Sequence, residues 1–289
     1  MGTQFVPTWV TVDGGHTRRA HPTSDGTIAA FLPALSLLKP NLRMNRPLKI
    51  VHTSDVHLND EPDGYKVREA FSQVVDTVID TQSDLFLIAG DLFDHNEISR
   101  STVEFVYEEL ARVECPTVMI VGNHDVWDER SIVKRMDFRK AGRHVTLLND
   151  AHGMQVTLPE LHATVWGRCM LDHDRTNKPM AGAPSRVGDY WHIGMAHGLY
   201  IDEPESDRAS LITPDEIEAS GFDYLALGHV HAHRQMRHGN TLACYPGVCA
   251  AHVGTADAGC VTLISLTPGK LAKAVAHRLG DLPRLRRSA

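Results

Sequence analysis

The feature that most constrains the fold of this 289-residue chain is a repeated pattern of short apolar runs, each followed at once by Asp, Asn or His. Apolar runs of this length, bounded by glycine or polar residues, are typical of buried strands. The five runs lead into Asp55-Val56-His57, Gly90-Asp91, Gly122-Asn123-His124-Asp125, His197-Gly198 and Gly228-His229-Val230-His231. Because ligands bind at the carboxyl ends of strands in open α/β sheets, we expect these polar side chains to meet at one edge.

Two amphipathic stretches separate the first three runs. Residues 65–81 and 101–113 carry apolar side chains at helical spacing, and Ser99 or Ser101 would cap the second helix. Strands are expected over residues 49–53, 85–89, 117–121, 164–166, 192–196, 224–227 and 260–266, with a hairpin over 234–237 and 241–245. The strand–helix alternation is typical of βαβ units. We therefore predict an α/β (α+β) fold, a four-layer α/β/β/α sandwich of two mixed β-sheets flanked by helices.

Changes in pattern suggest three parts of the chain. Residues 1–45 show no sustained period and are either a flexible extension or the product of a start codon placed too early, since Met44 precedes the first strand. Residues 46–275 would form the folded domain, and residues 276–289 a basic C-terminal tail. Within the domain, residues 168–189 lack periodicity, as long functional loops often do.

Composition narrows the function classes. The formal net charge of −7 and the pI of about 6.2 disfavour tight, non-specific binding of nucleic acid through its phosphates. Five cysteines without a Cys-x-x-Cys pair disfavour a disulfide framework or a thiolate zinc site and fit a reducing, cytoplasmic location. No apolar run approaches the roughly 18 residues of a membrane-spanning helix, so we expect no membrane partner.

The polar residues after the runs make sense as ligands of two divalent cations. Asp55 and His57, like His229 and His231, have the spacing of residues on one face of a strand. Oxygen and imidazole donors without thiolates suit manganese, iron, zinc or nickel, with manganese preferred. Asp91 is the candidate bridging ligand. His124 could protonate a leaving group, and Asp125 could orient its ring.

Together the five motifs resemble the pattern of calcineurin-like metallophosphoesterases over residues 48–267. The resemblance implies one metal site formed by Asp55, His57, Asp91 and His231, and another formed by Asp91, Asn123, His197 and His229. It also implies that His124 is the catalytic histidine. Three segments, residues 52–55, 87–94 and 245–247, most resemble the Mre11/SbcD DNA-repair exonuclease branch. That branch implies an ATPase partner protein.

The sequence also departs from that branch. Asn59 and Val248 replace a common glycine and a common serine, and the 58 residues after His231 are too few for a DNA-capping domain. The leading hypothesis is an exonuclease-like phosphodiesterase, a binuclear phosphoric ester hydrolase in which a metal-bridging hydroxide attacks phosphorus in line. The alternatives are an enzyme acting on nucleotides or other small phosphoesters, and a non-catalytic scaffold of the same fold. The oligomeric state is not indicated.

Four other polar positions are candidates for either a role in the site or an ordinary structural role. We expect His52 to be packed rather than a ligand. His95, next to Asp94, could contact phosphate or a ligand. Asp172-His173-Asp174 is read as a solvated loop, with substrate contact as the alternative. His233 is expected on the sheet surface.

Overall fold

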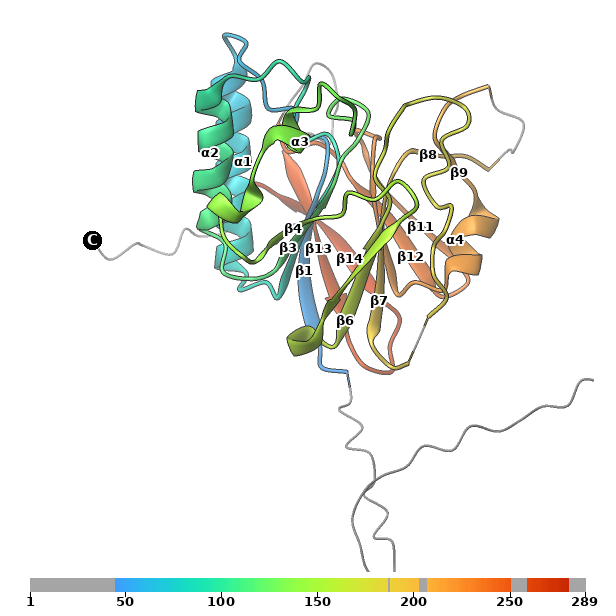
Figure 1. Cartoon of the computed structure of the whole chain (residues 1–289). Coiled ribbons are helices and arrows are strands. Elements are labelled where there is room, and N and C mark those ends of the chain that lie inside the picture. The colour runs from blue at the N-terminus through green and yellow to red at the C-terminus, as the bar shows by residue number, and fades with distance from the viewer. Residues whose placement is uncertain (1–44, 187, 203–206, 251–258, 281–289) are drawn as a thin grey trace, which may run out of the picture. The chain divides into compact units, whose positions relative to one another are not determined.

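The computed structural model describes residues 45–186, 188–202, 207–250 and 259–280, which belong to one compact unit (Figure 1). Nearly all of the predicted N-terminal extension, and residues 281–289 of the predicted tail, lie outside the described residues. No helix among the described residues has the length and apolar character needed to cross a bilayer.

Two six-stranded mixed sheets form the centre of the unit. The first has the strand order β14-β13-β1-β2-β3-β4. Strands β1 to β4 are parallel to one another, and β13 is antiparallel to both of its neighbours, β1 and β14. Its strands are β1 (Leu48–Thr53), β2 (Leu85–Ala89), β3 (Thr117–Ile120), β4 (Val145–Leu147), β13 (Cys260–Leu266) and β14 (Lys273–Arg278). The sheet thus extends three residues past the domain boundary that we placed at residue 275.

The second sheet has the order β11-β12-β10-β7-β6-β5, parallel except at its two edges. Its strands are β5 (Met154–Leu158), β6 (Ala163–Gly167), β7 (Trp191–His197), β10 (Tyr224–Gly228), β11 (His233–His238) and β12 (Thr241–Pro246). A separate two-stranded ladder joins β8 (Leu199–Tyr200) to β9 (Leu211–Ile212). This ladder directly follows His197 and becomes important for the site below.

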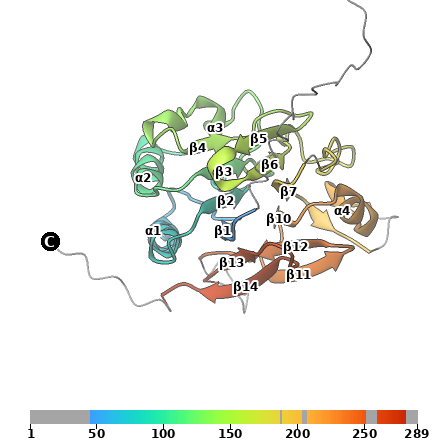
Figure 2. The ribbon, with the colours of Figure 1, turned by 90° about the horizontal axis from the view of Figure 1, so that it is seen from below.

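Helices cover the outer faces of both sheets (Figure 2). They are α1 (Gly64–Asp80), α2 (Arg100–Ala111), α3 (Ile132–Arg135) and α4 (Pro214–Ser220), with 3₁₀ turns at Phe138–Lys140 and Pro159–Leu161. Apolar residues of α1 and α2 pack on the first sheet, and α4 packs on the second. The predicted four-layer sandwich is therefore confirmed.

Strand alternation explains how the layers adhere. In β2, Leu85, Leu87 and Ala89 face the second sheet, whereas Phe86 and Ile88 face the helices. Every residue of this strand is buried, and complete burial of a Leu, Ile or Phe side chain contributes about 1.5–3 kcal/mol. The strand is therefore fixed on both faces, and its carboxyl end is held in place.

The cysteines form no disulfide among themselves, and two tryptophans belong to the core. All five cysteines are free, and four of them are buried. Trp166 and Trp191 are buried between or behind the strands. The described part of residues 168–189, the segment without periodicity, contains no helix or strand.

Candidate metal centre

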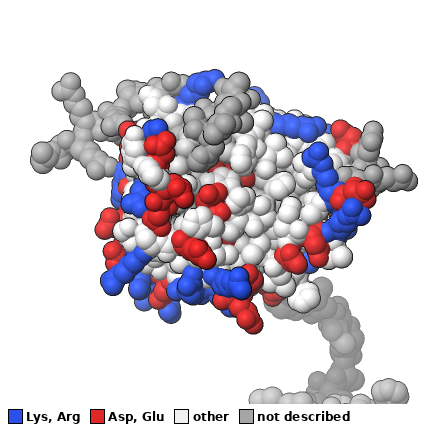
Figure 3. Space-filling view, turned by 90° about the horizontal axis from the view of Figure 1, so that it is seen from above, with Lys and Arg blue, Asp and Glu red and all other residues white. Residues whose placement is uncertain are grey.

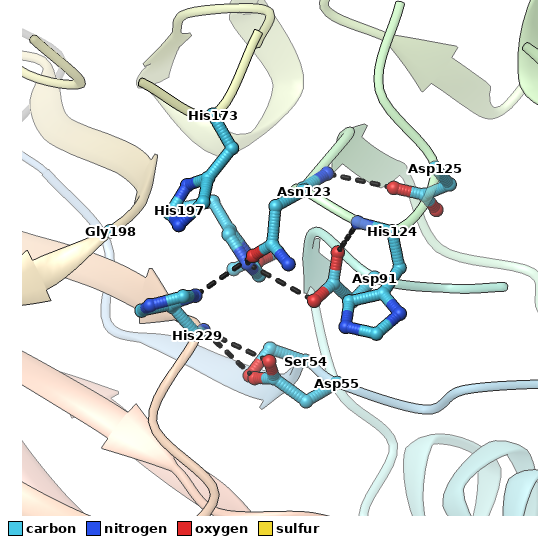
Figure 4. Close-up of polar contacts among 12 residues, drawn as sticks. Ser54, Asp55, Asp91, Asn123, His124, Asp125, His173, His197, Gly198 and His229 are labelled. Carbon is cyan, nitrogen blue, oxygen red and sulfur yellow. Dashed lines mark hydrogen bonds and ion pairs between the residues drawn. The ribbon is translucent and has the colours of Figure 1, made fainter. Parts of the chain in front are cut away.

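The seven predicted ligands converge where the parallel strands of both sheets end. Asp55 and His57 follow β1, Asp91 follows β2 and Asn123 follows β3, whereas His197 ends β7 and both His229 and His231 follow β10. Figure 4 shows the side chains of Asp55, Asp91, Asn123, His197 and His229 directed toward a common centre. Each sheet therefore supplies part of the cluster.

The reason that we gave for the pairing of Asp55 with His57 is wrong. β1 ends at Thr53, and both residues adopt a left-handed backbone, with φ of 52° and 56°. His229 is also left-handed, with φ of 101°, beyond the end of β10. Strand alternation does not orient these side chains; strained turns do, as is frequent at functional sites.

Backbone hydrogen bonds hold the turn after β1 against the turn after β2. The Asp55 N–H donates to Gly90 O (3.1 Å), and the His57 N–H donates to Asp91 O (3.0 Å). The two carboxylate-bearing turns therefore run side by side. This arrangement brings Asp91, which also has a left-handed φ of 52°, next to Asp55 and His57.

Two groups of donor atoms can be distinguished. In the first, His231 Nε2 lies 3.2 Å from His57 Nε2 and 3.9 Å from Asp55 Oδ1. In the second, His197 Nε2 lies 3.2 Å from Asp91 Oδ2 and 3.1 Å from Asn123 Oδ1, and the same Asn123 oxygen lies 2.8 Å from His229 Nδ1. Two donors that each lie about 2.1 Å from one tetrahedral ion are about 3.4 Å apart. The spacings fit convergence on cations.

Asp91 lies between the two groups. It offers a ligand atom within 4.8 Å of those of His57 and His124, and one within 4.8 Å of those of Asp55 and His197, so it neighbours members of both groups. Its second oxygen accepts the His124 N–H at 2.9 Å. This is the position that a bridging carboxylate requires.

The carboxylates also need a positive partner. Asp55 and Asp91 are 0% and 1% exposed, and in the described part of the chain neither forms an ion pair with lysine or arginine. Burial raises the pKa of Asp55, against the charge of His197. Burial opposes ionisation of Asp91 as well, but the charge and hydrogen bond of His197 outweigh it and lower the pKa of Asp91. Adjacent buried carboxylates of this kind fit divalent cations.

Hydrogen bonds fix the orientation of two of the imidazoles. His197 Nδ1 donates to Ala89 O at 2.8 Å, and His57 Nδ1 donates to Asp94 Oδ1 at 3.0 Å, so Nε2 of each ring faces the cluster. Burial lowers the pKa of His57 to about 4, which keeps its ring neutral. Burial would do the same to His197, but Asp91 raises the pKa of His197 to about 9. A cation at this position would displace that proton.

Two glycines allow the close approach of backbone and ligands. A Cβ atom added to Gly122 would lie 2.2 Å from Asp91 Oδ1 and 2.6 Å from His197 Cε1. At Gly90, where φ is +89°, it would lie 2.3 Å from His197 Nδ1. Any larger residue would displace the ligands.

The predicted partner of His124 is wrong. The Asp125 carboxylate is buried and accepts the backbone N–H groups of Gly122 (2.7 Å) and Leu92 (2.8 Å), and burial raises the pKa of Asp125 to about 6. It therefore links the turns after β2 and β3. His124 Nδ1 instead donates to Asp94 O at 2.7 Å, with Asp94 Oδ1 at 3.4 Å. Asp94, which sequence reasoning missed as a site residue, holds both His57 and His124.

The remaining candidates divide between core and site. His52 is buried, and its Nδ1 lies 2.8 Å from the Tyr224 hydroxyl of the other sheet, so the packed reading is confirmed. His95 Nδ1 accepts the Glu97 N–H at 3.1 Å and lies in the wall of a cavity beside His124. Asp172 and Asp174 are exposed, as expected. His173 is exposed too, but its ring centroid lies 5.2 Å from that of His229, next to the cluster.

That cavity has a volume of about 780 Å³. It opens beside Asn123 and His124 and is lined, apart from His95 and Asn96, by charged side chains: Asp94, Glu97, Asp128, Glu129, Arg130 and Arg135. Figure 3 views the face at the carboxyl ends of the strands, where acidic side chains lie on both sides of an uncharged centre and most basic ones lie nearer the edges.

Comparison with known proteins agrees with this geometry. Residues 48–233 match the family model described as calcineurin-like phosphoesterase. The uncharacterized metallophosphoesterase YhaO of Bacillus subtilis is 27% identical over 258 residues, which cover 78% of this chain and 59% of that protein. The DNA double-strand break repair protein Mre11 of Aeropyrum pernix is 27% identical over 228 residues, covering 69% and 53%. The chain thus spans less than two thirds of either relative. The solved structure of TT1561 from Thermus thermophilus shares the fold, with a TM-score of 0.54 and 12% identity over 80% of this chain and 99% of that one.

Proposed function

Because the chain belongs to the calcineurin-like phosphoesterase family, we propose that it is a phosphodiesterase that hydrolyses its substrate at the seven-residue cluster. The observation that carries the proposal is the position of Asp91, which lies next to two groups of oxygen and nitrogen donors, each of them drawn from both sheets. In this proposal one cation is held by Asp55, His57, Asp91 and His231. The other is held by Asp91, Asn123, His197 and His229.

Two divalent cations, with manganese preferred and iron, zinc or nickel as alternatives, would supply an activated water and offset the charge of the phosphoryl oxygens. The protein supplies the proton for the leaving group. His124 is exposed, and its Nδ1–H is engaged with the Asp94 carbonyl, so a protonated ring presents Nε2–H outward. The Asp94 carboxylate oxygen Oδ1 lies 3.4 Å from the same Nδ1. His124 is therefore the general acid.

The favoured substrate class within this chemistry is a phosphodiester of the kind cleaved by repair exonucleases. The similarity to Mre11 supports it, and an ATPase partner would then be expected. A second candidate, a nucleotide or other small phosphodiester, is favoured by the cavity beside His124. Four carboxylates against two arginines line that cavity, and this balance repels a polyanionic strand on the leaving-group side.

A paired assay separates the two substrates. The manganese-loaded protein is incubated with linear double-stranded DNA and, in parallel, with bis-p-nitrophenyl phosphate. Release of nucleotides from DNA supports the exonuclease-like assignment, whereas turnover of the small diester alone supports the second candidate. Turnover of neither would overturn the proposed function. The matched control is His124→Ala, which should lose activity on whichever substrate is cleaved.

We also propose a cytoplasmic location. Five free cysteines, four of them buried, are consistent with a reducing compartment.

A further inference from the structure

A second exposed histidine lies on the side of the cluster occupied by His229. His173 belongs to the irregular segment between β6 and β7, and its ring is tilted by 47° against that of His229 at 5.2 Å. Figure 4 shows the ring of His173 directed from its loop toward His197 and His229. The charges of His197, Asp91 and His124 all act on it. His173 is thus near the reacting region without being one of the seven ligands.

A directed chain of hydrogen bonds determines which ring nitrogen faces the site. Asn177 Nδ2 donates to Ser210 Oγ at 2.8 Å, and Ser210 Oγ lies 3.0 Å from His173 Nδ1. Because the serine oxygen accepts from the amide, its own proton is available to His173 Nδ1. With the Ser210 hydroxyl donating to Nδ1, the neutral ring carries its proton on Nε2. His173 therefore presents an N–H donor away from Ser210.

Ser210, the central residue of this series of hydrogen bonds, is held in place by contacts with the residues that follow His197. Ser210 is fully buried and has a left-handed φ of 52°. Its carbonyl accepts the Leu199 N–H at 2.9 Å, and its N–H donates to Asp174 O at 3.3 Å. Gly198, between Leu199 and the ligand His197, has no room for a side chain, since a Cβ would lie 2.3 Å from Ser210 O. The strand that delivers His197 also positions His173.

From this arrangement we infer that His173 is a substrate-binding residue, which donates its Nε2–H to a non-bridging phosphoryl oxygen on the side of the cluster opposite His124. The inference rests on the proposed phosphodiesterase function. A fixed donor at that position stabilises the charge that the phosphoryl oxygens carry in the transition state. Ser210 and Asn177 act through His173 and are positioning residues.

The test compares three substitutions of His173 in the manganese-loaded full chain. His173→Ala removes the donor. His173→Asn retains a polar group beside Ser210 but ends short of the Nε2 position, whereas His173→Gln places an amide N–H near it. Loss of one hydrogen bond to a charged group should lower kcat/KM on the cleaved substrate by about 10- to 100-fold in the first two variants. The glutamine variant should retain clearly more activity.

A binding measurement makes the inference independent of turnover. Calorimetric titration with orthovanadate, a mimic of the phosphoryl group, should show about 10- to 100-fold weaker binding to His173→Ala and His173→Asn than to the wild type. Metal content and unfolding midpoint should be unchanged. Lys178→Ala, an exposed neighbour in the same loop, should match the wild type in every measurement.

The outcomes separate the inference from its premise. If the wild type is active and His173→Ala retains the same kcat/KM and the same vanadate affinity, the proposed role of His173 is wrong. The proposed phosphodiesterase function would be unaffected by that result. Equal activity of the asparagine and wild-type proteins would lead to the same conclusion, because it would assign His173 a structural role through Ser210. If the wild type cleaves no phosphodiester, the proposed function fails. In that case, weaker vanadate binding by the His173 variants than by the wild type would still support His173 as an oxyanion-binding residue.

Discussion

At the scale of single residues, the hydrogen-bond partner of each side chain near the cluster determines its role in the chemistry of this centre. His57 and His124 both reach Asp94, whereas Asp125 is consumed by backbone N–H groups. The apolar runs predicted which side chains converge, because each of the seven follows or ends such a run. They could not assign the partner of His124, because Asp125 is the next residue along the chain whereas Asp94 is 30 residues away. That choice depends on how two turns pack.

Replacement of His124 by alanine should remove the proton donor. We expect turnover to fall by roughly 10²–10⁴-fold, the usual contribution of general acid catalysis. The metal content should stay near that of the wild type, because none of the seven ligands changes. Steady-state kinetics with elemental analysis measures both, and His152→Ala, an exposed histidine elsewhere on the surface, is the control. Undiminished turnover would remove His124 from the mechanism.

Replacement of Asp94 by alanine should weaken metal binding without touching a ligand. His57 would lose the acceptor that orients its ring, and loss of such a partner typically costs about 10- to 100-fold in metal affinity. Competition with a chromogenic chelator measures the change. Glu97→Ala removes a carboxylate from the same cavity wall and should leave the affinity unchanged. Equal affinities in both variants would show that Asp94 does not support the site.

At the scale of elements, the pattern of apolar runs predicted the central strands well. β2 and β13 have the expected limits, and α1 and α2 begin and end within two residues of them. β14 was missed because most of its residues are exposed, and β5 was missed although its part-buried apolar residues alternate with exposed polar ones. α4 was also missed, although Thr213 and Glu216 form a capping box and Gly221 ends the helix in a left-handed conformation. That signal was present in the sequence.

The turn after β3 offers a test of how closely an element must approach the site. In Gly122→Ala the new methyl group would overlap Asp91 Oδ1 at 2.2 Å, so the turn or the bridging carboxylate must move. We expect at least one metal ion per chain to be lost while the circular dichroism spectrum stays unchanged. Gly269→Ala, in a turn with open space around it, should keep full metal content. Full occupancy in both variants would refute the tight-approach explanation.

For the whole molecule, the two sheets are joined by apolar contacts, by the His52–Tyr224 hydrogen bond and by the shared cluster. The apolar contacts follow from strand alternation and were predictable. The pairing of His52 with Tyr224 was not, because it joins residues 172 positions apart whose register depends on the packing of one sheet on the other.

The buried His52 predicts a pH dependence of stability. Burial lowers the pKa of His52 to about 3, so the folded protein keeps the ring neutral while the unfolded chain protonates it below pH 6.5. Its contribution to stability is therefore present above pH 6.5 and is lost as the pH falls toward 3. Between pH 7 and pH 5 the wild type should lose about 2 kcal/mol more than His52→Gln. Urea unfolding of the metal-free proteins measures the difference, and equal losses would contradict the buried neutral state.

Removal of the cations should weaken the contact between the sheets. Ions that bind only the folded state at 100 times their Kd contribute about 2.7 kcal/mol. Chelation should therefore lower the Tm by about 5–10 °C, measured by calorimetry with elemental analysis of the treated protein. The effect should be much smaller in Asp91→Ala. An unchanged Tm after verified metal loss would mean that the cations do not bridge the sheets.

The division of the ligands between the sheets has a consequence for fragments of the chain. Asp55, His57, Asp91 and Asn123 precede the irregular segment between β6 and β7, and His197, His229 and His231 follow it. A protein cleaved within that segment would carry the carboxylates on one polypeptide and three of the imidazoles on the other. Neither polypeptide alone would retain a complete donor set, so recovery of hydrolysis on mixing would report their reassembly.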